Sequence, residues 1–150
     1  MYTGRRSASC RRSDCVSSKC DASIRLLSTT KAASDWAVSL PEDVRGRTLQ
    51  GLISRWARND SNAVGEWINH LTGAVRDEAI TAFSTTVGSR DPAAALTWAM
   101  TVAEPAVRNA TVERVVMSWS RRSPGDARAW IQNSALPDPE KSRLLSLPVR

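Results

Sequence analysis

Apolar positions recur with helical spacing around four tryptophans that divide the chain evenly. Small or aliphatic residues stand four and three positions before each Trp, and one and four positions after it, fully in the first three copies and partly in the fourth. These offsets place the side chains on one face of an α-helix. The pattern therefore predicts a first helix, helix A, whose indole rings pack in a core. The tryptophans, spaced by 31, 31 and 32 residues, are Trp36, Trp67, Trp98 and Trp130.

Capping signals agree with this apolar spacing. A residue whose side chain accepts hydrogen bonds from the free N–H groups of a first helical turn stands seven positions before each of these tryptophans. Proline, which suits the first helical position, follows the last two. Each helix A is expected to end at a joint that contains Pro or Gly. The capping residues are Thr29, Asp60, Asp91 and Ser123, followed by Pro92 and Pro124 in the last two cases.

A second apolar stripe, helix B, follows each joint with the spacing i, i+3, i+4, i+7. It reads Leu49, Leu52, Ile53 and Trp56 in the first copy, Ile80, Phe83 and Val87 in the second, and Val112, Val115, Val116 and Trp119 in the third. Two short antiparallel helices cannot bury their faces alone, whereas stacked pairs share a continuous core. We therefore expect an all-α fold, a right-handed stack of antiparallel helix pairs (an α-solenoid of about 3.5 repeats) over 29–150. Its units are 29–59, 60–90, 91–122 and 123–147.

The segment Asp91-Pro92-Ala93-Ala94-Ala95-x-x-Trp98, with its looser copies, resembles the Trp-rich helical repeats of many bacterial repeat proteins. In architecture it is similar to tetratricopeptide and HEAT arrays. It departs from the tetratricopeptide pattern, because its period is near 31 residues and the Leu-Gly-x-x-Tyr element is absent. The resemblance covers roughly 29–145 and implies a scaffold that presents a surface to a binding partner.

Charge is concentrated in the first part of the chain. The net charge is +6, but residues 1–30 hold six Arg or Lys against two Asp, which leaves the array nearly neutral. Residues 1–28 are rich in Ser, Arg and Cys and lack apolar periodicity, so we expect a disordered basic tail. A mis-assigned start codon is an alternative explanation of this tail. Without a signal peptide or a membrane-spanning stretch, a cytoplasmic protein is favoured.

The sequence offers little catalytic or cofactor chemistry. The three cysteines, Cys10, Cys15 and Cys20, lie in the tail with a spacing that matches no common zinc or iron–sulfur site. The single histidine, His70, makes a Ser–His–Asp triad improbable, and no Gly-rich phosphate loop is present. The carboxylates Asp77, Glu78, Glu42 and Asp43 stand at helix starts, where they suit the helix dipole. We therefore expect no enzyme activity, no metal and no cofactor.

Two sets of residues are candidates for binding a partner. An arginine recurs near the start of each helix B, where a cation opposes the helix dipole. We favour a structural role, either an ion pair with Asp35, Glu66 or Asp43 or a bond to the end carbonyls of helix A; the alternative is a ladder that grips an acidic peptide. The second set follows each Trp late in helix A and suits hydrogen bonding to a peptide. The candidates are Arg45, Arg76 and Arg108, then Asn69, His70, Met100, Thr101, Gln132 and Asn133.

These observations favour a non-enzymatic helical-repeat scaffold that binds a protein or a peptide. Self-association through exposed ends of the array is a further expectation, because Ile24, Leu26 and Leu27 provide only a thin cover for the first unit. One alternative is a nucleic-acid-binding repeat that uses the basic tail and the arginines. Another is a fragment of a longer repeat protein.

Overall fold

The computed structural model describes residues 29–147, and within this range the chain forms helices and no strands. This confirms the expected all-α class; the expected disordered tail lies outside the described residues. A helix over 29–38 is followed by α2 (Glu42–Asn59), α3 (Ser61–Asn69), α4 (Gly73–Val87), α5 (Pro92–Ala99), α6 (Pro105–Ser120), α7 (Pro124–Asn133) and α8 (Asp138–Leu145).

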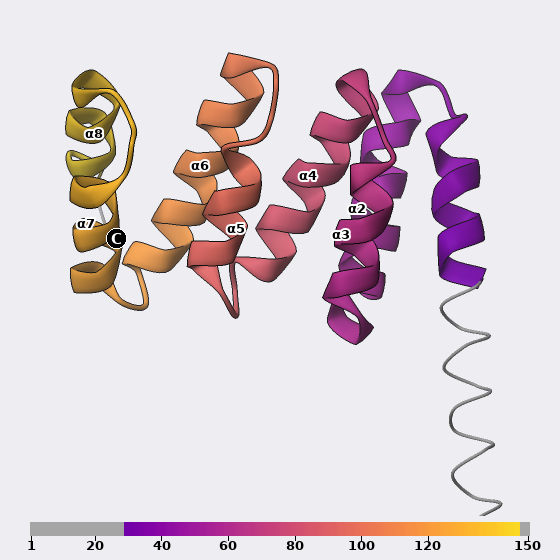
Figure 1. The fold of residues 1–150 in the computed structure, drawn as a ribbon, viewed down its shortest axis with the longest axis horizontal. Coiled ribbons are helices and arrows are strands. Elements are labelled where there is room, and N and C mark those ends of the chain that lie inside the picture. Colours follow the sequence, from indigo (N-terminus) through magenta and orange to yellow (C-terminus); the bar gives the residue numbers. More distant parts are fainter. Residues whose placement is uncertain (1–28, 148–150) are drawn as a thin grey trace, which may run out of the picture.

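The helices stand side by side in a row along the long axis of the molecule, with the helix over 29–38 at one end and α7 and α8 at the other (Figure 1). The longer helices α2, α4 and α6 pack on one another in succession, and α5 lies against both α4 and α6. Helices 29–38, α3, α5 and α7 correspond to helix A of the sequence analysis. Helices α2, α4, α6 and α8 correspond to helix B.

The helix starts agree with the capping signals. The carboxylate of Asp60 accepts a hydrogen bond from the N–H of Ala63, and that of Asp91 accepts one from Ala94, both at 2.9 Å. Gly73, where α4 begins, has a φ of 63°, in the left-handed region that favours glycine. Short turns of this kind bring each helix back against its predecessor.

The tryptophan rings do not all lie in the core, as the sequence pattern had suggested. Trp67 is 4% exposed and packs on Trp56, whereas Trp36 is 60% exposed. The difference arises because the rings pack against the preceding helix pair. Trp67 Nε1 donates to Asp35 Oδ1 at 2.7 Å, but the described residues include no pair before Trp36. The expectation that Trp36 packs in the core is therefore wrong.

The buried face of helix A agrees only in part with the predicted one: the residues one position after each Trp are buried as expected, but those four positions before it are not. Ala32, four positions before its Trp, is exposed, and Ala63 and Ala94 at the same offset are only half-buried. The residues two positions before each Trp are buried instead in the first three copies, because this side of the helix faces the following pair. They are Ser34, Gly65 and Leu96.

Several polar contacts join one helix pair to the next, and two of them span about one repeat in sequence. The hydroxyls of Ser54 and Thr86 lie 2.9 Å apart, 32 positions away from each other. The guanidinium of Arg122 donates to the backbone carbonyls of Gly88 and Ser89, which begin the turn after α4, 34 and 33 positions away. These bonds fix the register between neighbouring pairs.

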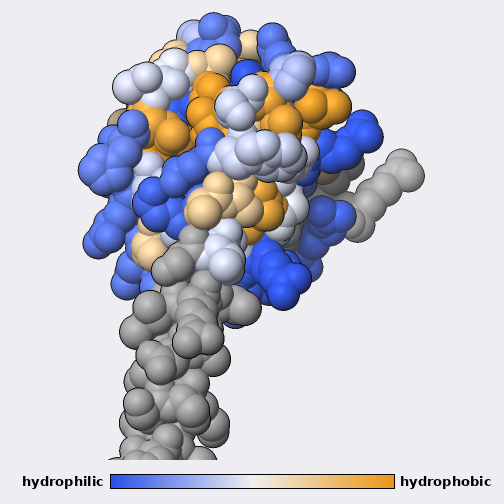
Figure 2. All heavy atoms as spheres, turned by 90° about the vertical axis from the view of Figure 1, so that its right-hand side faces the viewer, coloured by the Kyte–Doolittle hydropathy of each residue, from blue (hydrophilic) through white to orange (hydrophobic). Residues whose placement is uncertain are grey.

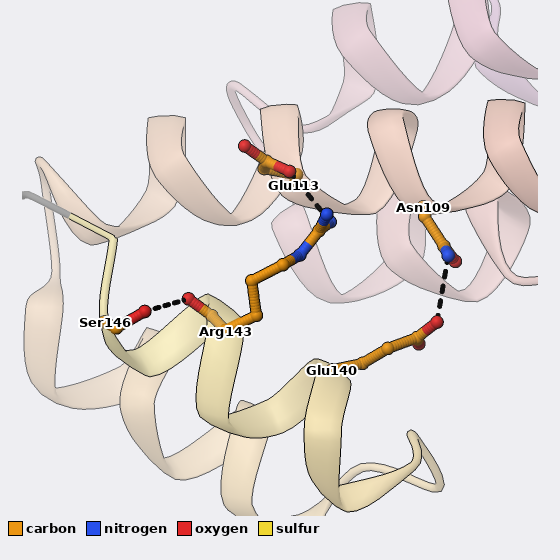
Figure 3. Close-up of polar contacts among 5 residues, drawn as sticks. All are labelled: Asn109, Glu113, Glu140, Arg143 and Ser146. Atoms are coloured by element: carbon orange, nitrogen blue, oxygen red, sulfur yellow. Dashed lines mark hydrogen bonds and ion pairs between the residues drawn. The ribbon is translucent and has the colours of Figure 1, made fainter.

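The last helix, α8, is fastened to α6 by two polar contacts (Figure 3). Asn109 Nδ2 donates to Glu140 Oε1 at 2.9 Å, and Arg143 Nη2 lies 2.8 Å from Glu113 Oε2. Leu144 of α8 is buried in the same hydrophobic cluster as Val112 of α6. The short helix α8 therefore packs on the side of α6.

Candidate binding groove

A groove of about 860 Å³ lies between α3 and α5. Its walls are the two short helices, and its floor comes from the ends of α2 and α4. The volume falls within the range of sites that bind small molecules or short chain segments. The lining includes Ala57, Arg58, Asn62, Gly65, Glu66, Asn69, Phe83, Thr86, Val87, Arg90, Asp91, Ala94 and Trp98.

The wall formed by α3 carries a polar stripe. Asn62, Glu66 and Asn69 line the groove and are exposed, and their spacing of four and three residues places them on one face of the helix. Each asparagine amide offers both donors and an acceptor. This stripe can therefore hydrogen-bond an extended backbone laid along the groove.

The opposite wall and the floor supply an apolar surface. The half-buried ring of Trp98 meets Phe83 edge-on, with their centroids 5.4 Å apart. The same ring lies close to Gly65, where an added Cβ would crowd it at 3.1 Å from Trp98 Cζ2. The missing side chain lets the indole approach the backbone of α3. The exposed part of the ring is a surface on which an apolar side chain can rest.

The charges of the groove balance. Arg58, at the end of α2, and Arg90, in the turn after α4, are exposed and supply two positive charges. Glu66 and Asp91 supply two carboxylates. Asp91 already uses Oδ1 to cap α5. A groove with two charges of each sign does not attract a polyanion by charge alone. It suits a ligand that combines polar backbone groups with one or two apolar side chains.

Among residues 29–147, no cluster of three His, Cys, Asp or Glu side chains is placed to hold a metal ion. In the same part of the chain, no helix combines the length and apolar character that crossing a bilayer requires.

Of the six candidates late in helix A, only Asn69 lines this groove. The others are exposed at the C-terminal ends of their helices or just beyond them. Two of them form hydrogen bonds within the chain. The Thr101 hydroxyl donates to the carbonyl of Trp98 at 2.8 Å, and the backbone carbonyl of Gln132 accepts from Lys141 at 3.2 Å. The remaining ones are His70, Met100 and Asn133.

Two of the three arginines contact the next helix pair. Arg45 forms a two-pronged ion pair with Glu78, at 2.7 and 3.0 Å, and this carboxylate holds the pKa of the Arg45 guanidinium above its usual value. Arg76 Nη1 donates to the carbonyl of Thr101, past the end of α5, at 3.0 Å. The half-buried Arg108 has no side-chain partner among the described residues.

The structural role that we favoured is therefore confirmed for Arg45 and Arg76. The suggested carboxylate partners were wrong. Asp35 instead pairs with Lys31 and accepts from Trp67. Glu66 lies in the groove, and neither arginine bonds to Asp43.

The expectation that Asp77 acts on its own helix start also needs correction. Asp77 is the fifth residue of α4, is 6% exposed, and accepts from the backbone N–H groups of Ala103 and Glu104, both at 3.1 Å. These groups lie immediately before α6. The carboxylate therefore holds the turn of the following helix pair.

The groove residues Arg58, Asn62 and Arg90 were not identified from the sequence. A signal for Asn62 is present, because it completes a polar stripe with Glu66 and Asn69 that the apolar pattern leaves unexplained. The arginines lie near the turns between pairs, and only the fold brings them to one groove.

No protein-family model, curated protein or solved structure matches this chain.

Proposed function

We propose that the chain is a non-enzymatic helical-repeat scaffold of the α-solenoid type that binds an extended peptide segment of another protein. The observation that carries this proposal is the groove between α3 and α5. Its polar stripe faces an indole surface, which is the combination needed to hold a peptide backbone and anchor one side chain.

The repeat architecture is supported by the polar contacts between helix pairs. The contact from Arg45 to Glu78 spans 33 positions, and that from Thr81 to Thr111 spans 30. Units that contact only their neighbours, one period apart, are the defining feature of a solenoid. The resemblance to Trp-rich, tetratricopeptide and HEAT repeats belongs to this proposal.

The expected ligand has an apolar residue that rests on Trp98 and a backbone that meets Asn62 and Asn69. A hydrogen bond contributes roughly 0.5–1.5 kcal/mol in net terms. Both amides are exposed, so the lower part of this range applies and removing both weakens binding about tenfold. Side-chain contacts with Glu66 and Arg90 then select among peptides. The nearly neutral lining is the reason for preferring a peptide over nucleic acid.

The test is selection of peptides from a random library on the full chain, followed by fluorescence anisotropy with the double variant Asn62→Ala/Asn69→Ala. We expect about tenfold weaker binding by the double variant and unchanged binding by Gln50→Ala, an exposed amide on α2 outside the groove. Failure to select any peptide above background, or equal affinities for all three proteins, would refute the proposal.

A further inference from the structure

We infer that the two ends of the array bind each other, so that Trp36 of one copy inserts into a pocket at the α7–α8 end of a second copy. This inference rests on the proposed solenoid architecture and goes beyond peptide binding. Its starting point is the contrast between the 60% exposed Trp36 and the 4% exposed Trp67, which occupy the same position in successive units.

The internal junctions show what an indole at this position contacts. Trp98 lies over Gly65 of the preceding helix A and meets Phe83 of the preceding helix B. Trp67 likewise contacts Trp56 and donates to Asp35, both in the preceding pair. Each ring therefore fits a socket formed by the pair before it, and Trp36 offers the same ring with no socket among the described residues.

A socket without a ring exists at the other end of the chain. A pocket of about 360 Å³ opens beside α6, α7 and α8. Two of its residues correspond to the neighbours of Trp98: Arg128 stands two positions before Trp130, as Gly65 stands before Trp67. Counted from its tryptophan, Leu147 corresponds to Phe83, one position later because the turn before α8 is one residue longer, and it lies two positions past the end of α8.

Three further pocket residues correspond by position to residues that line the groove between α3 and α5. Counted from their tryptophans, Ser120, Arg121 and Pro124 match Ala57, Arg58 and Ser61. The pocket is thus the first half of a groove whose second wall, a following helix A, is missing among the described residues.

A second copy of this chain is the occupant that the structure favours, because its first helix presents the required wall and ring. Helix 29–38 lies at the opposite end of the row from α7 and α8 (Figure 1). Figure 2 shows the end that carries helix 29–38, where hydrophobic side chains gather between hydrophilic ones. In the contact, the Trp36 indole packs against Leu147, and the Arg128 guanidinium lies over its ring as a cation–π partner.

The contact joins two different surfaces, so it does not close into a symmetric dimer. Sedimentation velocity of the full chain tests this directly. We expect the mean mass of the wild type to rise with concentration beyond that of a dimer. Trp36→Ala and Leu147→Asp each weaken association roughly 30-fold, the factor for truncating an interface hot spot. The exposed Val107→Ala on α6 leaves it unchanged.

Mixing the two variants gives the sharpest test. Trp36→Ala retains its pocket and Leu147→Asp retains its indole, so the mixture forms one productive contact and yields a heterodimer that grows no further. Circular dichroism melting verifies that both variants fold. Arg128→Glu, at an exposed position, replaces Leu147→Asp if the latter is unstable.

Three outcomes would overturn the inference: a wild type that remains monomeric at all concentrations, equal association of Trp36→Ala and wild type, or a mixture that forms no heterodimer. If acrylamide quenching shows that Trp36 is shielded from solvent in the monomer, residues 1–28 of the same chain would be the segment that covers it, and the inference would be wrong. Peptide binding in the groove involves neither Trp36 nor Leu147, so its loss or survival is scored separately.

Discussion

Removing the carboxylate of Asp77 should loosen the junction between the second and third helix pairs. Asp77 is 6% exposed, and its two oxygens accept from the N–H groups of Ala103 and Glu104 at 3.1 Å each. A hydrogen bond to a charged group contributes about 1.5–3 kcal/mol. Both loop residues are exposed, so water partly replaces the lost acceptor and the lower figure applies. Asp77→Ala is therefore expected to lower the free energy of unfolding by about 3 kcal/mol, and Asp77→Asn, which keeps one acceptor, by roughly half as much.

Urea unfolding followed by circular dichroism and by tryptophan fluorescence measures this loss, and coincident curves verify a single transition. For a chain of this size, the melting temperature should fall by about 6–12 °C in Asp77→Ala. Glu66→Ala, an exposed carboxylate in the groove, serves as the control and should stay within about 0.5 kcal/mol of the wild type. A loss below about 1 kcal/mol in Asp77→Ala, or equal losses in both Asp77 variants, would show that the two N–H groups do not depend on this carboxylate.

Two further predictions concern a pair of glycines and the carboxylate of Asp35. Gly88→Ala should destabilise the fold by about 1–3 kcal/mol, because its Cβ would lie 2.9 Å from the carbonyl oxygen of Ser84. Gly51→Ala, which meets nothing within 4 Å inside α2, should stabilise it by up to about 1 kcal/mol in the same urea experiment; the opposite order would contradict the packing argument. Hydrogen bonds from Lys31 and Trp67 lower the pKa of Asp35 from its usual 3.8. Its stabilising contribution is therefore fully present above about pH 4 and lost as the pH falls through the lowered pKa. The stability difference between wild type and Asp35→Asn should shrink below that pH, and a constant difference would exclude the linkage.

The helices were predictable from the sequence because their determinants are local. Caps such as Asp60 and Asp91 act within three residues, and the stripe from Leu49 to Trp56 is set by helical spacing alone. The exposure of Trp36 was not predictable in this way. The exposure of this ring depends on whether a preceding helix pair packs against it. The repeating pattern is the same in every copy, so it does not show which copy lacks such a pair.

The groove was only partly predictable for a related reason. Asn69 was found from the sequence. The residues two positions before the first three tryptophans were not, because Ser34, Gly65 and Leu96 are all buried but have chemically different side chains. Gly65 accommodates the Trp98 ring, whereas Leu96 fills its site with its own side chain. A pattern search looks for similar residues at equivalent positions, so it misses a site built from dissimilar ones.

These differences between junctions also set the strength of the proposed contact between copies. Within the chain, Trp67 gains a hydrogen bond because Asp35 stands one position before Trp36. The corresponding residue of the last helix A is Ala129, which has no acceptor in its side chain. The indole N–H of Trp36 must then keep a water partner or find a backbone carbonyl, while its ring is buried against Leu147. The contact between copies should therefore be weaker than the internal junction that holds Trp67, and it would depend on concentration while the internal junction does not.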